Sequence, residues 1–243
     1  SLRTPTLTLE APAYGDFDEA IQTGIRMAPS MVGLGLLEAI TAEDIEAGAD
    51  PDDVDGDGVS GRVQRVDGEI GRFGWRAGAT SIDEQIAGAF SGDMGLTSAL
   101  RPDEQCTEFQ PECTDAGHGN DEEGYEVNSN VFEAVAIYSR VLAVPARRSV
   151  ANPDVLAGRE LMKDVGCTSC HAERFVTGPA SIPALAEQRI FPYTDMLLHD
   201  MGEGLADGVP EHDASGSEWR TPPLWGIGLI DAVNGHLFLM HDG

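Results

Sequence analysis

The stretch Gly166-Cys167-Thr168-Ser169-Cys170-His171 carries the strongest structural signal in this sequence. Two thiols three positions apart can each form a thioether with a vinyl group of haem, and the adjacent histidine can then bind the iron. The pattern therefore predicts one covalently attached c-type haem, held by Cys167 and Cys170 with His171 as an iron ligand. A helix that ends at Gly166 would give the chain the tight entry that this motif needs.

Two other uses of this cysteine spacing remain as alternatives. A thioredoxin-like redox motif would need a surrounding βαβ pattern, which we do not find in the sequence. Half of a zinc site would need a second CxxC or an HxxxH run, and the sequence contains neither.

The sequence offers several residues that could complete the haem site. The second axial ligand could be any of five side chains, namely His199, Met201, His236, Met240 and His241. A methionine ligand would raise the reduction potential and a histidine would lower it. Arg220 is a natural partner for a haem propionate, although a structural ion pair would explain it equally well. Trp225, in the same segment, is a second cofactor-binding candidate.

An acidic loop, Asp53-Val-Asp55-Gly-Asp57-Gly58-Val59, has the spacing of a calcium-binding loop. Its carboxylates occupy positions 1, 3 and 5, glycine occupies position 6, and the Val59 carbonyl would serve at position 7. The twelfth position is Gln64, so the bidentate glutamate is missing. We predict calcium on Asp53, Asp55 and Asp57; the alternative is a solvated acidic turn.

Composition limits the partners and the compartment. The formal net charge is −27, from 42 acidic and 15 basic residues, which argues against nucleic acid and anionic membrane surfaces. The acidity suits solubility, or the steering of a basic redox partner. No apolar run approaches the roughly 18 residues of a membrane span. Cys106 and Cys113 predict a loop-closing disulfide, hence an oxidising compartment, periplasmic or secreted.

The abundance of glycine and proline, 29 and 14 residues, predicts short helices joined by long ordered loops. Capping signals start helices after Thr41, at 81–91 and at Asn152-Pro153, the last running to about Val165. Apolar residues at helical spacing predict a further helix over 130–143, and a short one is expected at 183–189. We therefore expect a mainly α fold.

Several stretches together resemble the bacterial di-haem oxidoreductase, or putative peroxidase, family, also called thiol oxidoreductase-like. They cover most of the chain: Arg26-Met-Ala-Pro29 through Val32-Gly-Leu-Gly-Leu-Leu-Glu-Ala-Ile40, Asp50-Pro-Asp-Asp-Val-Asp-Gly-Asp-Gly-Val-Ser-Gly61, Gly71-Arg-Phe-Gly-Trp75, Ala87-Gly-Ala-Phe-Ser-Gly-Asp-Met94, Val144-Pro-Ala-Arg-Arg148, the CxxCH run, Pro192-Tyr-Thr-Asp-Met-Leu-Leu-His-Asp-Met-Gly202 and Glu218-Trp-Arg-Thr-Pro-Pro-Leu-Trp-Gly-Ile-Gly228. The family is similar to the di-haem cytochrome c peroxidases and MauG.

The resemblance implies a cytochrome c-like haem fold that is a fragment of a tandem di-haem architecture. Residues 1–145 would be the remainder of the first cytochrome-like half, with the acidic loop, and residues 146–243 the c-type haem domain. Family members carry two CxxCH motifs and this sequence has one, so we expect truncation ahead of Ser1. The second axial ligand of the relatives would fall after Gly243.

The resemblance also suggests catalytic roles. Trp75 resembles the tryptophan that relays electrons between the two haems. Gln85 and Asp93 resemble the glutamine and the acid near the peroxide-binding haem, although the relatives have glutamate and a different spacing. Asp93 would act as an acid or base in O–O cleavage; a plain helix-terminal carboxylate is the alternative.

The leading functional hypothesis is a periplasmic di-haem oxidoreductase of peroxidase type. The haem on His171 would receive electrons from a redox-protein donor and pass them, by way of Trp75, to a second haem outside this chain that binds peroxide. The alternative is a non-catalytic electron-transfer cytochrome or a haem- and calcium-binding module. Thiol oxidation by the cysteines is a third option, which thioether formation would exclude.

Overall fold

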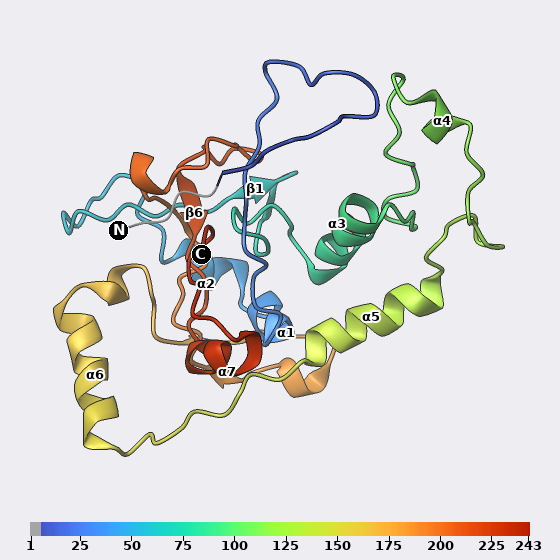
Figure 1. Ribbon diagram of the computed structural model, residues 1–243. Helices are drawn as coiled ribbons and strands as arrows, with labels where there is room; N and C mark the ends of the chain where they lie inside the picture. The colour runs from blue at the N-terminus through green and yellow to red at the C-terminus, as the bar shows by residue number, and fades with distance from the viewer. Residues whose placement is uncertain (1–5) are drawn as a thin grey trace.

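The computed structural model describes residues 6–243, and Ser1–Pro5 lie outside it. Short helices and very short strands alternate with long connections (Figure 1). The α-helices are α1 (Leu34–Glu38), α2 (Ala42–Glu46), α3 (Ile82–Met94), α4 (Pro111–Thr114), α5 (Ser129–Val141), α6 (Pro153–Asp164) and α7 (Ile230–Asn234). The 3-10 helices are η1 (Cys167–Ser169), η2 (Pro183–Leu185), η3 (Glu203–Leu205) and η4 (Ile227–Leu229).

The strands form three antiparallel pairs. They are β1 (Arg65–Val66) with β2 (Glu69–Ile70), β3 (Phe175–Val176) with β4 (Arg189–Ile190), and β5 (Leu198–Asp200) with β6 (Glu218–Arg220). The β5–β6 pair matters most for the site, because it aligns His199 opposite Trp219. A further bridge between Arg62 and Leu198 attaches the chain after the acidic loop to β5.

The predicted helix starts are confirmed, because each depends on a local capping hydrogen bond. The side chains of Thr41 and Ser81 each accept a bond of 3.1 Å from the amide three residues later, at the start of α2 and α3. Asn152 caps α6 by accepting a bond of 2.8 Å from the Asp154 amide, two residues later, with Pro153 at the first helical position. The helix expected over 130–143 begins slightly earlier, after the cap Asn128. At 183–189 the structure has only the single turn η2.

The predicted fold class, a mainly α cytochrome c-like fold from a tandem di-haem architecture, is wrong for this structure. Within residues 6–243, 29 % of the chain is helical and 10 % is strand, and no cytochrome fold is evident. The physical reason lies in long-range pairing. Residues 198–200 and 218–220 read as loops locally, yet they exchange backbone hydrogen bonds across the connection formed by residues 201–217. No helix in the described chain is long and apolar enough to cross a membrane.

The hydrophobic core lies where α1, α3 and α5 pack together (Figure 1). Aliphatic side chains dominate it, as the low aromatic content requires. Its buried members are Leu37, Ile40, Ile45, Ile70, Phe73, Ile82, Ile86, Ala136, Ile190, Met196 and Leu197. The core therefore draws residues from both sides of position 145, and the division at that position stays a prediction.

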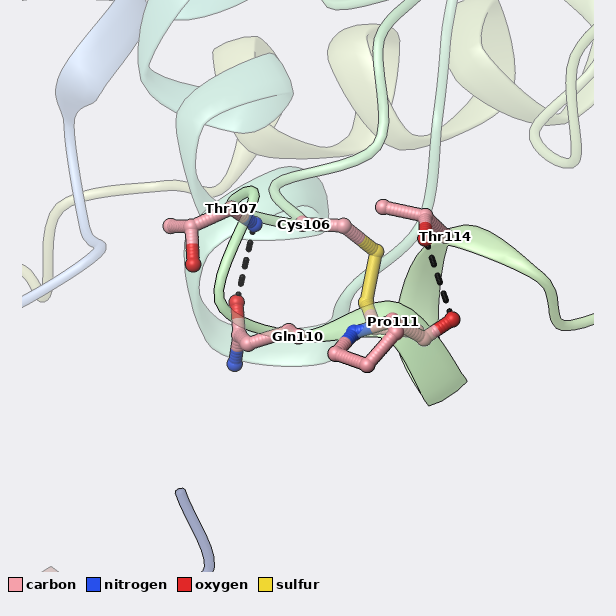
Figure 2. The surroundings of a disulfide bond; sticks show 6 residues. Cys106, Thr107, Gln110, Pro111 and Thr114 are labelled. Carbon is pink, nitrogen blue, oxygen red and sulfur yellow. Dashed lines mark hydrogen bonds between the residues drawn. A yellow bond between two sulfur atoms is a disulfide. The ribbon is translucent and has the colours of Figure 1, made fainter. Parts of the chain in front are cut away.

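The cysteine pair predicted to close a loop lies at disulfide geometry. Cys106 and Cys113 have Cα atoms 5.7 Å apart and sulfur atoms at bonding distance. Figure 2 shows two hydrogen bonds that shape the loop, Thr107 N to Gln110 Oε1 at 2.9 Å and Thr114 Oγ1 to the Pro111 carbonyl at 3.0 Å. The loop therefore has its own local hydrogen bonds in addition to the cross-link.

An ion pair between Arg62 and Glu218 fastens β6 to the chain after the acidic loop. Arg62 Nε donates to Glu218 Oε1 at 2.6 Å, and the Ser215 amide donates to Oε2 at 2.8 Å. Burial alone would raise the pKa of Glu218, but these bonds outweigh it and lower the pKa to about 2.

We predict that the Glu218 carboxylate makes the free energy of unfolding decrease at acidic pH. The pKa of Glu218 is lower in the folded state than its ordinary value of 4.5. Ionised Glu218 therefore stabilises the fold above pH 4.5, and this stabilisation is lost as the pH falls toward about 2. Thermal unfolding measured across this window should show a smaller decline for Glu218→Gln than for the wild type. Glu84→Gln, which removes an exposed pair with Arg101, is the matched control and should follow the wild type. Parallel declines for wild type and Glu218→Gln would contradict the prediction.

Candidate functional site

The CxxCH motif forms one tight turn on the surface. The chain leaves α6 through Gly166, whose φ of 83° favours glycine, and Cys167–Ser169 then form η1. The His171 amide donates to the Cys167 carbonyl at 2.9 Å, which closes the turn. Both cysteines are free thiols, Cys167 exposed and Cys170 half-buried. Two reactive sulfurs thus stand on a single turn, as thioether formation with one haem requires.

The imidazole of His171 is oriented by the backbone. Its Nδ1 lies 2.7 Å from the carbonyl oxygen of Tyr193. Because a carbonyl only accepts hydrogen bonds, we infer that Nδ1 carries the proton and Nε2 keeps a free lone pair. Iron-binding histidines commonly have this outer hydrogen bond, which fixes both tautomer and ring orientation. The donor set therefore fits a haem iron at Nε2.

A buried segment, residues 192–199, runs alongside the motif and holds it. The amides of Thr194 and Asp195 donate to the carbonyls of Ala172 and Cys170 at 3.1 and 3.0 Å. Tyr193 adopts a positive φ of 54°, and its carbonyl meets His171. The segment is itself held in place, because Thr194 Oγ1 donates to the Thr221 carbonyl at 2.6 Å.

His199, at the end of this segment, has both ring nitrogens engaged. Nε2 lies 2.7 Å from Asp195 Oδ2, and Nδ1 lies 2.8 Å from the Ser60 carbonyl. Neither nitrogen has a lone pair free for iron, so His199 is unsuited to be the second axial ligand in this arrangement. Burial by itself lowers its pKa, but hydrogen bonds to Asp195 and Cys170 and their charges raise it to about 10.

The acidic loop lies directly against the motif. Ser169 Oγ donates to Asp57 Oδ2 at 2.8 Å, and the Ser60 carbonyl meets the His199 ring. One small cavity is lined by the loop, the motif and the segment 192–199 together, through Gly48, Asp50, Asp55, Asp57, Val59, Gly61, Ser169, Asp195, Leu197 and His199. Sequence reasoning treated the loop and the motif as separate sites, and nothing in their spacing signals this contact.

In the structure, the loop carboxylates that lie together are not the three that the calcium-loop spacing predicts. Ligand atoms of Asp50, Asp53 and Asp55 lie within 4.8 Å of one another, while Asp57 is directed to Ser169. Asp50 belongs to the group because it accepts hydrogen bonds from the amides at 54 and 55. Gln64, at the twelfth position, is buried and donates instead to the Glu211 carbonyl at 2.8 Å.

Arg220 is a buried cation that makes no ion pair within residues 6–243. It is 4 % exposed, and its guanidinium donates to the carbonyls of Gly74 and Thr221 at 3.0 and 3.1 Å. Burial lowers its pKa to about 10, and the charge of Asp195 opposes that shift. The structural ion pair considered for Arg220 is thus not observed. A buried cation with mainly neutral partners would favour an anion such as a propionate beside it.

Trp225 and Trp75 occupy different surroundings. Trp225 packs against the core, and its indole nitrogen is buried without a hydrogen-bond partner in the described chain. Trp75 donates from Nε1 to the Met27 carbonyl at 2.6 Å and packs edge-on against Trp219 and His241, with centroids 6.3 Å away in each case. The sequence does not predict a relay role for Trp219 or His241.

Gln85 and Asp93 both lie on α3 but are not brought together. They are eight positions apart, which is about 12 Å along a helix axis. Gln85 is half-buried and its Oε1 lies near Gly74, 3.9 Å from where a Cβ would stand, whereas Asp93 is exposed near the end of the helix. Their joint role near a peroxide-binding haem stays a prediction.

The family model described as "Di-haem oxidoreductase, putative peroxidase" matches residues 14–243, nearly the whole chain. The chain belongs to the di-haem oxidoreductase family. Neither a curated protein nor a solved structure matches it.

Family membership confirms the resemblance seen in the sequence. It supports haem as the cofactor and a peroxidase-type oxidoreductase as the broad activity, at the level of the family description. In this di-haem oxidoreductase the residues that fit a haem are the paired thiols, the oriented His171 and the buried Arg220.

Proposed function

We propose that this chain is the part of a periplasmic di-haem c-type oxidoreductase that carries an electron-transferring haem. The observation that carries the proposal is the oriented imidazole of His171, one residue after two free thiols on a single turn. Within a di-haem family, this donor set suits covalent attachment through Cys167 and Cys170.

Each residue has a distinct task in this proposal. A bound haem supplies one-electron redox chemistry. His171 presents Nε2 to the iron while the Tyr193 carbonyl holds its Nδ1 proton. Arg220 supplies a buried positive charge for a propionate, and the unpartnered indole nitrogen of Trp225 is a further donor for the cofactor.

Trp75 is proposed as the electron relay toward a second haem outside this chain, where peroxide would be reduced. Its half-buried ring packs on Trp219 and His241, and its carbonyl accepts a 2.8 Å bond from the Arg220 amide. This backbone link joins the relay residue to the proposed propionate partner. Gln85 and Asp93 are proposed to serve the oxidant site of that second haem.

The charge and the cysteine pair support the partners and the compartment. A net charge of −27 suits electrostatic steering of a basic redox-protein donor. The disulfide geometry of Cys106 and Cys113 suits the oxidising periplasm or secretion.

We predict one covalent haem on this chain when it is exported in a host that attaches c-type haem. Mass spectrometry should show a single haem addition, which Cys167→Ala combined with Cys170→Ala abolishes. His171→Ala should keep the thioethers but shift the visible spectrum, because the iron loses its proximal nitrogen. The control pair Cys106→Ser and Cys113→Ser should keep the haem. No covalent haem, or two, would overturn the proposal.

We predict that Trp75→Phe slows electron transfer in the full-length, haem-loaded protein. With peroxide and a reduced donor, the rate of donor oxidation should fall at least about tenfold, which corresponds to about 1.4 kcal/mol in the barrier. Tyr138→Phe, at an exposed aromatic residue of α5, should leave the rate unchanged. If the wild type oxidises no donor and its visible spectrum does not change on addition of peroxide or cyanide, the chain belongs to a non-catalytic electron-transfer protein instead.

Calcium is proposed for the acidic loop, with Asp50 joining Asp53 and Asp55. Carboxylate oxygens this close repel one another unless a cation lies between them. Calorimetric titration with calcium should show binding that Asp50→Asn and Asp53→Asn each weaken, whereas Asp16→Asn, at an exposed site elsewhere, does not. If the wild type binds no calcium, the acidic loop is a solvated turn instead.

A further inference from the structure

We infer that His199 is a positioned positive charge that raises the reduction potential of the haem attached at Cys170. This inference rests on the proposed function, because it concerns the same haem. His199 would be a positioning residue, since it acts on the haem through space and binds neither iron nor oxidant.

The hydrogen bonds of the ring favour an imidazolium. The Ser60 carbonyl opposite Nδ1 can only accept, so that nitrogen must carry a proton. Asp195 opposite Nε2 already accepts from the Leu197 amide through its other oxygen, at 3.0 Å. The Asp195 contact does not involve the Cys170 sulfur, so it would remain when that sulfur forms a thioether.

The charge lies against the atom that joins the protein to the haem. His199 Nδ1 is 3.7 Å from Cys170 Sγ, and the Asp195 amide donates to the Cys170 carbonyl at 3.0 Å. The ring is 6 % exposed, so solvent screens it weakly. The ring packs closely against Gly61, where an added Cβ would lie 2.8 Å from its Cε1.

The charge of His199 is opposite in sign to the other charges around the cavity. The cavity beside the motif is lined by the carboxylates of Asp50, Asp55, Asp57 and Asp195, and His199 is the one basic side chain among its lining residues. Without His199, the charged side chains that line this cavity would all be carboxylates. A nearby cation stabilises the reduced haem, which holds one electron more, so its loss must lower the potential.

His199→Gln tests the inference in the haem-loaded chain. Glutamine keeps an N–H donor for Asp195 but carries no charge, so spectroelectrochemistry should show a downward shift of the midpoint potential at unchanged haem content. Combining His199→Gln with Asp195→Asn removes both charges and should bring the potential back toward the wild-type value. His212→Gln, at an exposed histidine outside the cavity, is the control and should cause no shift.

The outcomes separate this inference from the proposed function. No covalent haem on the wild type would overturn both. An attached haem whose potential is unchanged by His199→Gln would overturn only the role of His199. A double variant whose potential stays as low as that of the single variant would show a structural effect, and would also overturn it. Nitrogen-15 NMR of the haem-free wild type at pH 8 should show both ring nitrogens of His199 protonated; one unprotonated nitrogen refutes the fixed charge independently of haem loading.

Discussion

The backbone pairing between residues 170–172 and 193–195 is the interaction on which the site depends. The CxxCH turn follows α6, a helix with no buried residue, so the helix itself does little to hold the motif against the body. The hydrogen bonds to Cys170 and Ala172, together with the His171–Tyr193 contact, provide that attachment. Three backbone-mediated bonds over three residues define both where the thiols stand and where the imidazole points.

A second layer holds this segment in place. The Leu224 amide donates to the Pro192 carbonyl at 2.8 Å, and the Thr221 amide donates to the Leu197 carbonyl at 3.0 Å. Because β5 and β6 lie next to these contacts, the short sheet and residues 221–224 act as one support. The buried side chains of Met196 and Leu197 continue the segment into the hydrophobic core, so the site is anchored to that core.

Buried cations are the other recurrent feature of the interior. Arg76 is fully buried and is held by Asp207 and by backbone carbonyls, and its guanidinium lies 3.9 Å from the centre of the Trp219 ring. The imidazole of His199 pairs with the Asp195 carboxylate, whereas Arg220 has carbonyl partners and no ion pair in residues 6–243. Since an uncompensated buried charge is costly, Arg220 is the cation for which an additional anionic partner is most expected.

The sequence by itself determined the features that depend on neighbouring residues. The caps Thr41, Ser81 and Asn152 start helices because each bonds an amide two or three residues away. The CxxCH run predicted a haem site for the same reason, since its three groups lie on one turn. Only the tertiary structure decided the rest, because the contacts join distant segments: His199 meets Ser60 across 139 residues, and Asp57 meets Ser169 across 112. The mainly α expectation failed on such long-range pairing too, since local propensity does not reveal which loop segments exchange backbone hydrogen bonds.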